Sequence, residues 1–247
     1  MTKSVLKTVK ARILNQKNQN KIWSYSDFSD LPFGAATKAL SLLTKDGQIN
    51  RIQKGYYYIP KQTILGEVKR DYTDLLFKKL DNKNIFYCLS GLSGYNKIGL
   101  TTQISNIITI ACDTPMRSTD KVKFLLRKKP HSGTEIERIV LDALNDIENI
   151  SGTTPDKVLY KIKNIIKSNK ISINDLGHSA LSEVPRVRAI IGALGQELDM
   201  DAKLLKQLKN KVNPATVYLL DISSVLKYSS NWNIKARNDG KKILKRA

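Results

Sequence analysis

The stretch from Phe33 to Pro60, FGAATKALSLLTKDGQINRIQKGYYYIP, decides the fold of the N-terminal part of this chain. Apolar residues recur at helical spacing in its first half, which predicts a helix over residues 35–45 with an inward face of Ala36, Ala39, Leu40 and Leu43. Gly47 follows, and glycine ends helices because it adopts the left-handed conformation at little cost. The residues on either side of a Lys54-Gly55 turn read as strands, which predicts a β-hairpin over 48–59.

Two shorter helices are expected before this stretch. Apolar residues at helical spacing predict an amphipathic helix over residues 4–15. Ser26-Asp27-Phe28 reads as the capped start of a brief second helix, and Leu31-Pro32-Phe33-Gly34 interrupts the chain before the third. Three helices followed by a hairpin is the order of a winged helix-turn-helix, and a break of about four residues between helices two and three fits that motif.

In a winged helix-turn-helix, the third helix enters the major groove with its N-terminal, solvent-facing residues toward the base edges. We expect Lys38 and its neighbours to read bases and Lys45 to lie near phosphates, while small Ala35 allows close approach. The hairpin would form a wing against phosphate or the minor groove, and the first helix would add backbone contacts. The residues expected to bind DNA are therefore Lys10, Arg12, Ala35, Thr37, Lys38, Ser41, Lys45, Arg51, Lys54 and Tyr56.

The run Tyr56-Tyr57-Tyr58 contributes to more than the wing. Successive strand residues point to opposite faces of a sheet, so at least one of the three tyrosines is expected in the core. A winged helix used only for protein contacts is the alternative interpretation of this domain.

The charge of the chain points to a polyanionic partner. Its 247 residues include 42 Lys+Arg and 22 Asp+Glu, which gives a formal charge of +20. An AT-rich coding bias explains many lysines but would favour glutamate too, and glutamate occurs only six times. The net charge is +7 over residues 1–60, +7 over 61–130, zero over 131–170 and +6 over 171–247. Because the excess is spread beyond the first sixty residues, we expect the second domain also to meet a polyanion. A generic basic surface is the alternative.

Composition restricts the class of protein. A hydrophobic content of 41% and a charged content of 26% are typical of a globular chain. No apolar run reaches the roughly 18 to 20 residues of a membrane span, and the first residues lack a signal-peptide apolar core. Cys88 and Cys112, expected as packed thiols in apolar strands, are too few for a disulfide-stapled secreted fold. We therefore expect a cytoplasmic protein that makes no membrane contact.

The rest of the chain predicts a small sheet with helices gathered after it, so the fold class is α+β. Strands are expected over 85–89, 107–112 and 122–127, and helices over 68–80, 134–146, 155–167, 173–182, 187–198 and 202–208. The predicted domains are a winged helix-turn-helix over 1–60 and a larger mixed α/β domain over 61–247.

Motifs of catalysis are missing from the sequence. It contains no G-x-x-x-x-G-K-[ST] phosphate loop and no G-x-G-x-x-G fingerprint. The segment from Ser90 to Tyr95 fails the G-x-S-x-G nucleophile pattern, because the last position is tyrosine. His131 and His178 lie far apart in sequence and beside no cysteine or carboxylate cluster, so no metal site is expected. We expect neither an enzyme nor a bound cofactor.

Several segments together resemble AbiEi-type antitoxins of type IV toxin–antitoxin (abortive infection) systems. The resemblance covers most of the chain and is carried by Phe33–Pro60, Ser90-Gly91, Gly99-Leu100-Thr101-Thr102-Gln103, the strand Ile107–Ala111, ALSEVPRVRAIIGALGQEL at 180–198, and Asn213-Pro214. The basic end after Asn213 matches no motif of that family.

The resemblance implies a two-domain protein. Its N-terminal domain would repress its own promoter by binding inverted repeats in double-stranded DNA. Its C-terminal domain would carry antitoxin activity and support cooperative DNA binding. The partner would be a nucleotidyltransferase-like toxin, countered without a stable complex. Two alternatives remain open from the residues: a winged-helix regulator whose second domain senses a ligand or a protein, and an RNA-binding protein.

Overall fold

The computed structural model describes residues 4–15, 21–64, 66–68, 72–222 and 224–237, and it divides the chain into two compact units. The first unit spans residues 1–84 and the second spans residues 85–247. Each combines helices with small sheets, so the predicted α+β fold class is confirmed.

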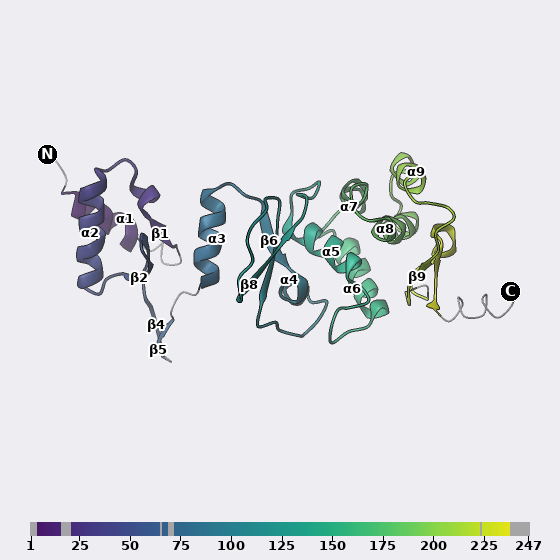
Figure 1. The fold of residues 1–247 in the computed structure, drawn as a ribbon, viewed down its shortest axis with the longest axis horizontal. Coiled ribbons are helices and arrows are strands. Elements are labelled where there is room, and N and C mark those ends of the chain that lie inside the picture. The colour runs from purple at the N-terminus through teal and green to yellow at the C-terminus, as the bar shows by residue number, and fades with distance from the viewer. Residues whose placement is uncertain (1–3, 16–20, 65, 69–71, 223, 238–247) are drawn as a thin grey trace. The chain divides into compact units, whose positions relative to one another are not determined.

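The first unit has the element order of a winged helix-turn-helix (Figure 1). Its elements are α1 (Val5–Leu14), β1 (Trp23–Ser24), the 3-10 helix η2 (Tyr25–Phe28), α2 (Phe33–Lys45), β2 (Asn50–Gln53) and β3 (Tyr56–Tyr58). The strands form one antiparallel sheet in the order β1-β3-β2. The predicted second helix is therefore a single 3-10 turn, and α2 corresponds to the predicted third helix.

The core of the first unit lies between α1, α2 and this sheet. Its buried side chains are Val9, Ile13, Trp23, Phe28, Ala36, Ala39, Leu40, Leu43, Ile49 and Tyr57. The rings of Trp23 and Phe28 stack with their centroids 5.4 Å apart. Tyr57 and Tyr58 are both buried, which confirms that the tyrosine run contributes to the core.

The first unit continues beyond residue 60. A second antiparallel hairpin, β4 (Lys61–Thr63) and β5 (Gly66–Val68), leads into α3 (Tyr72–Asn82). The predicted helix therefore begins at Tyr72 and not at residue 68, which pairs in a strand. On α3, Lys78 bonds Asp27 of η2 at 3.3 Å and Lys79 bonds Gln53 of β2 at 3.1 Å. These contacts hold α3 to the winged helix, so the division falls after residue 84, whereas the sequence placed the domain boundary at residue 60.

The second unit begins with a three-stranded sheet in the order β6-β7-β8. Its elements are β6 (Tyr87–Ser90), α4 (Gly91–Lys97), β7 (Ile108–Cys112) and β8 (Val122–Leu126). Strands β6 and β7 are antiparallel, whereas β7 and β8 are parallel. The predicted strands are therefore present, with ends that shift by a few residues.

Within the described part of the second unit, five helices follow the sheet. Helix α5 lies beside β6 (Figure 1). They are α5 (Glu135–Asn145), α6 (Pro155–Lys167), α7 (Ile173–Ala180), α8 (Pro185–Glu197) and α9 (Ala202–Asn210). A parallel strand pair, β9 (Tyr218–Leu219) and β10 (Ile234–Lys235), and the 3-10 helix η3 (Ser230–Trp232) complete the unit. Thr134, Ser172 and Asp201 each cap a helix by accepting a backbone N–H bond, as N-cap residues do.

Both cysteines are buried free thiols, as predicted. Cys88 lies in β6 and Cys112 in β7, and burial raises the pKa of Cys88 to about 12. Among the described residues, no helix combines the length and apolar character that crossing a membrane requires.

Helix α8 carries a glycine that allows η3 to pack closely against it. A Cβ placed on Gly192 would lie 2.3 Å from two carbons of the Trp232 indole, closer than real side-chain carbons approach. Trp232 is buried, so its ring has little room to move away. Only glycine therefore fits at this position without displacing the indole.

We predict that Gly192→Ala destabilises the protein by about 1–3 kcal/mol, since overpacking a filled core forces side chains or backbone to shift. Urea unfolding followed by Trp fluorescence would measure the change. The matched control is Gly34→Ala, because a Cβ on exposed Gly34 of α2 meets nothing within 4 Å. The control should be neutral or slightly stabilising. Equal stability of the Gly192→Ala variant and the wild type would contradict this account of the packing.

Candidate nucleic-acid interface

Helix α2 presents a polar stripe opposite its buried face. Lys38, Ser41 and Lys45 are exposed, and their spacing places them on one side of the helix. Within the described part of the chain, none of the three forms an ion pair or a side-chain hydrogen bond. The thirteen residues of α2 include no acidic side chain. The stripe therefore offers uncompensated positive charge and one free hydroxyl.

Two further residues of α2 that were predicted to contact DNA are less accessible to a partner. Ala35 and Thr37 are half-buried at its N-terminal end. The Thr37 hydroxyl donates to the Phe33 carbonyl one turn earlier, at 2.8 Å. That hydroxyl is therefore used within the helix.

The β2–β3 hairpin places its predicted wing residues at its tip. Arg51 and Lys54 are exposed, and Arg51 Nε donates to the Gln53 carbonyl at 3.3 Å. Tyr56 is half-buried, with the Lys79 ammonium 5.4 Å from its ring centroid. The tip thus presents two exposed cations, whereas Tyr56 lies partly beneath a lysine of α3.

Tyr25, which the sequence analysis did not single out, connects this hairpin to the start of α2. Its hydroxyl shares a hydrogen bond with that of Tyr57, at 3.3 Å, and its ring meets Phe33 edge-on at 5.2 Å. The pKa of Tyr57 is raised to about 12, mainly by burial and secondly by this hydrogen bond, so the phenol stays protonated. Gly55 of the turn packs against the same Tyr25 ring and has a φ of +85°. A Cβ at this position would lie 3.0 Å from Tyr25 Cε2, so the close contact depends on glycine.

A half-buried carboxylate holds the turn that contains Tyr25. Asp27 accepts the Ser24 backbone N–H at 2.8 Å and pairs with Lys21 at 3.0 Å. Burial raises the pKa of Asp27, but these hydrogen bonds outweigh it, so the pKa lies below its ordinary value. Asp27 is therefore ionised at neutral pH and anchors η2.

The two residues of α1 that were predicted to contact DNA differ in whether an ion pair within the protein already holds their side chains. Lys10 is exposed and makes no ion pair with a described residue. Arg12 forms a two-pronged pair with Asp30, at 2.7 and 2.5 Å, which ties α1 to the turn before α2. Arg12 must leave Asp30 before it can contact a phosphate, so Lys10 is the more available cation.

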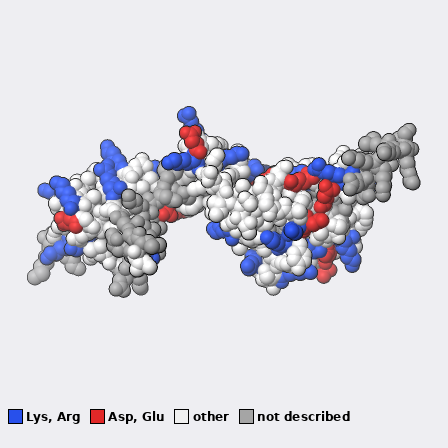
Figure 2. Space-filling model, turned by 90° about the horizontal axis from the view of Figure 1, so that it is seen from below, with Lys and Arg blue, Asp and Glu red and all other residues white. Residues whose placement is uncertain are grey.

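Basic side chains also occur on the second unit. Exposed lysines accompany β8 and the following loop (Lys121, Lys123, Lys128 and Lys129) and α9 (Lys203, Lys206, Lys209 and Lys211). Figure 2 shows Lys and Arg in several separate groups on the face it draws, with fewer Asp and Glu. The basic C-terminal end lies mostly outside the described residues, which stop at residue 237.

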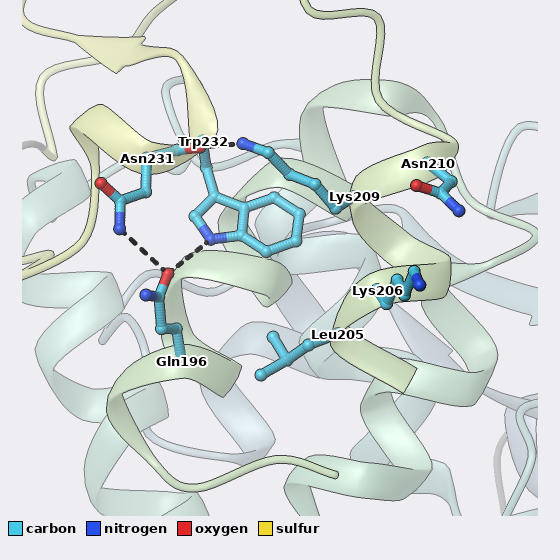
Figure 3. A pocket seen from close by; sticks show the side chains of 7 residues that line it. All are labelled: Gln196, Leu205, Lys206, Lys209, Asn210, Asn231 and Trp232. Carbon is cyan, nitrogen blue, oxygen red and sulfur yellow. Dashed lines mark hydrogen bonds between the residues drawn. The ribbon is translucent and has the colours of Figure 1, made fainter. Parts of the chain in front are cut away.

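A hollow of about 550 Å³ opens between α8, α9 and η3 (Figure 3). Gln196 accepts hydrogen bonds from the Trp232 indole N–H, at 3.2 Å, and from the Asn231 amide, at 3.3 Å. Lys209 donates to the Asn231 carbonyl, and its ammonium lies 4.8 Å from the Trp232 ring centroid. These polar groups satisfy one another and fasten η3 to the two helices, which gives the hollow a structural explanation.

A smaller pocket of about 240 Å³ lies where α5 meets the β6-β7-β8 sheet. Ser90, Thr109 and Lys123 stand opposite one another on adjacent strands and line it. The buried Asp142 carboxylate forms part of its wall. Its oxygens accept from Ser90 Oγ at 2.7 Å, Arg127 Nε at 2.8 Å and Arg138 Nη2 at 3.0 Å.

Arg138 balances the charge inside this cluster. Its side chain is 1% exposed, and it pairs with Asp142 and, at 2.7 Å, with Glu183. Burial lowers the pKa of Arg138, but the two carboxylates outweigh that effect and the pKa lies above its ordinary value. Sequence reasoning missed the network because Ser90 and Glu183 lie 52 and 45 residues from their partners. The i,i+4 spacing of Arg138 and Asp142 on a predicted helix was the signal that could have found its centre.

The structure brings together the two histidines, which lie far apart in the sequence. The rings of His131 and His178 stack with centroids 4.6 Å apart, and Asp175 lies 3.9 Å from His131 Nε2. The loop before α5 meets α7 here, which the sequence separation conceals. Among the described residues, no group of three or more His, Cys, Asp or Glu is placed to hold a metal ion.

Comparison with known proteins adds a fold likeness. No protein-family model matches the chain, and no curated protein matches it. A solved structure with a similar fold is that of the RV2827C protein from Mycobacterium tuberculosis, with a TM-score of 0.49 and 12% sequence identity. The match covers 87% of this chain and 83% of that one.

We predict that Asp142→Ala costs about 3–5 kcal/mol of stability, because removing one member of a buried ion pair leaves Arg127 and Arg138 without that counter-charge. Urea unfolding followed by circular dichroism would measure the loss. Asp120→Ala is the matched control, since exposed Asp120 has no described partner, and its effect should stay within about 0.5 kcal/mol. A change below 1 kcal/mol in Asp142→Ala would show that the network contributes little.

Proposed function

We propose that this protein is a DNA-binding autorepressor and antitoxin of a type IV toxin–antitoxin system, and that it acts in the cytoplasm without a cofactor or catalytic step. The observation that carries the proposal is the exposed, unpaired stripe of Lys38, Ser41 and Lys45 on α2, the helix in the recognition position. The N-terminal unit binds inverted repeats in its own promoter, and the second unit carries the antitoxin activity.

Electrostatics favours a nucleic-acid duplex as the partner of α2. The helix has no carboxylate, and its first N–H groups have no intrahelical partner, so its N-terminal end is electropositive. Lys54 and Arg51 of the wing add charge beside it. Lysines that neutralise phosphates release counterions, so the affinity falls steeply as salt rises.

Base contacts provide the sequence preference. Lysine donates to guanine O6 and N7 in the major groove, and serine bonds either a donor or an acceptor on a base edge. Lys38 and Ser41 lie one turn apart around the middle of α2, on the side of the helix opposite its buried residues. Lys45 at the other end, together with Lys54 of the wing, is left for the phosphates, which set position rather than sequence.

The antitoxin part of the proposal rests on the resemblance to AbiEi-type antitoxins. Two of its segments have defined places in the second unit. Ser90 belongs to the Asp142 network, and residues 180–198 include α8, which is largely buried in the core. The partner is a nucleotidyltransferase-like toxin encoded beside this gene, and it is countered without a stable complex.

A regulator whose second unit senses a small polar molecule is the second candidate. The 240 Å³ pocket favours it, because Thr109 and Lys123 line the cavity and make no ion pair or side-chain hydrogen bond with a described residue. Such a regulator would bind promoter DNA in the same way but would need no toxin. Rescue of toxicity separates the two candidates.

We predict that Lys38→Ala narrows the difference in affinity between the promoter repeat and scrambled duplex by about 1–3 kcal/mol. Lys54→Ala should weaken both duplexes equally and reduce the salt slope by about one, as expected for a phosphate contact. Fluorescence anisotropy over a salt series would measure both effects. Lys167→Ala is the control, because Lys167 is exposed on α6 of the second unit. If the wild-type protein bound the promoter repeat and the scrambled duplex with equal affinity at physiological salt, the proposed repressor function would be excluded.

We predict that full-length protein expressed from a separate promoter restores growth to cells that express the neighbouring nucleotidyltransferase gene. The double variant Lys38→Ala/Lys54→Ala should rescue equally, because both lysines lie in the first unit, outside the proposed antitoxin part. The same variant should lose repression of a promoter reporter. Rescue that disappears together with repression would contradict the assignment of the two activities to separate units.

A further inference from the structure

Phe33 is an exposed aromatic ring at the start of the proposed recognition helix. Its side chain is 68% exposed, at the edge of the helix face that buries Ala36, Ala39, Leu40 and Leu43. It is the first residue of the helix and follows Pro32, so it belongs to the turn that approaches base edges in a helix-turn-helix. A partner that covers this ring gains apolar contact area at the point where sequence is read.

The ring is held in position before any partner binds. Tyr25 contacts Phe33 edge-on, with centroids 5.2 Å apart and planes at 64°. Tyr25 is in turn hydrogen-bonded to Tyr57 of the wing sheet. A side chain that is already ordered loses little conformational entropy on binding, so more of its contact energy appears as affinity.

Thr37 extends the apolar character of this end of α2. It lies one turn after Phe33 on the same side, as residues four apart do in a helix. Its hydroxyl donates to the Phe33 carbonyl at 2.8 Å. With the hydroxyl used inside the helix, the side chain has its methyl group left for an apolar contact. The first turns of α2 therefore combine a ring and a methyl group beside Lys38.

These observations point to one feature of DNA. In the major groove, the thymine C5-methyl group is the apolar element of the base edges, and phenylalanine and the threonine methyl are side chains that contact it. We infer that Phe33, with the Thr37 methyl beside it, reads a thymine methyl group in the operator. The inference rests on the proposed function and names a specificity contact within it.

Charge favours a duplex over an apolar protein surface as the partner of this ring. Helix α2 carries two lysines and no carboxylate, and the wing adds Arg51 and Lys54. An apolar protein partner would have to desolvate these cations without compensation. A duplex compensates them with phosphates while a thymine methyl covers the ring.

The test removes one methyl group at a time. Duplexes that the full-length protein prefers are first selected from a randomised pool, and each thymine is then replaced by deoxyuridine, which lacks the C5-methyl group. At one thymine, the replacement should weaken wild-type binding about fourfold, the effect of one buried carbon. Phe33→Ala should bind the thymine duplex more weakly and show less than a twofold effect of the same replacement.

Matched variants separate the contact from general loss of binding. Thr37→Val keeps a methyl group and should retain the thymine effect, whereas Thr37→Ser should reduce it. Lys54→Ala should weaken binding while keeping the full fourfold effect. Circular dichroism should show that Phe33→Ala is folded, as expected for an exposed side chain.

Four results would overturn the inference. A deoxyuridine effect below twofold at every position would exclude thymine readout, and an undiminished effect in Phe33→Ala would assign it to another residue. Unchanged DNA binding by Phe33→Ala, together with a lower mass in light scattering, would assign the ring to self-association. If the pool yields no preferred sequence, the proposed repressor function itself fails, and the inference fails with it.

Discussion

The contact that the N-terminal unit depends on is the one between Tyr25 and its two aromatic neighbours. The ring of Tyr25 meets Phe33 at the start of α2, and its hydroxyl bonds Tyr57 in the sheet that carries the wing. A winged helix binds a duplex with helix and wing at once, so their relative position must be fixed before binding. Tyr25 fixes it from η2, where Asp27 holds the turn through Ser24 and Lys21.

Local pattern was enough to predict α1, α2 and the β2–β3 hairpin of this unit, but not the β4–β5 hairpin. The stripe from Ala36 to Leu43 defines α2, and Gly47 and Gly55 mark the ends of helix and hairpin, because both adopt positive φ. Tyr25 could not be assigned in the same way, since its partner Tyr57 lies 32 residues away. Propensity and periodicity describe neighbours in sequence, whereas this contact exists only once the sheet has paired.

The same limit applies more strongly to the second unit. Its strands and helices follow from apolar periodicity, but Asp142 meets Ser90 across 52 residues and Arg138 meets Glu183 across 45. His131 and His178 stack although no pattern links them. Carboxylates and histidines can be paired only when the packing of α5 and α7 is known. The candidate site on α2 was accessible from sequence because it lies on one helix, whereas the pocket at Asp142 draws on several elements.

The arginines and the lysines of this chain differ in the contacts that they make. Among the described arginines, pairing with carboxylates occurs at Arg12, Arg127, Arg138, Arg186 and Arg237. Arginine suits this structural role because its planar fork matches a carboxylate. The cations of α2 are lysines, which attract phosphate as point charges and discriminate less by geometry. In the proposed function, the lysines therefore supply affinity and Lys38 one base contact, while the ring of Phe33, in edge contact with Tyr25, adds an apolar group of defined position at the start of α2.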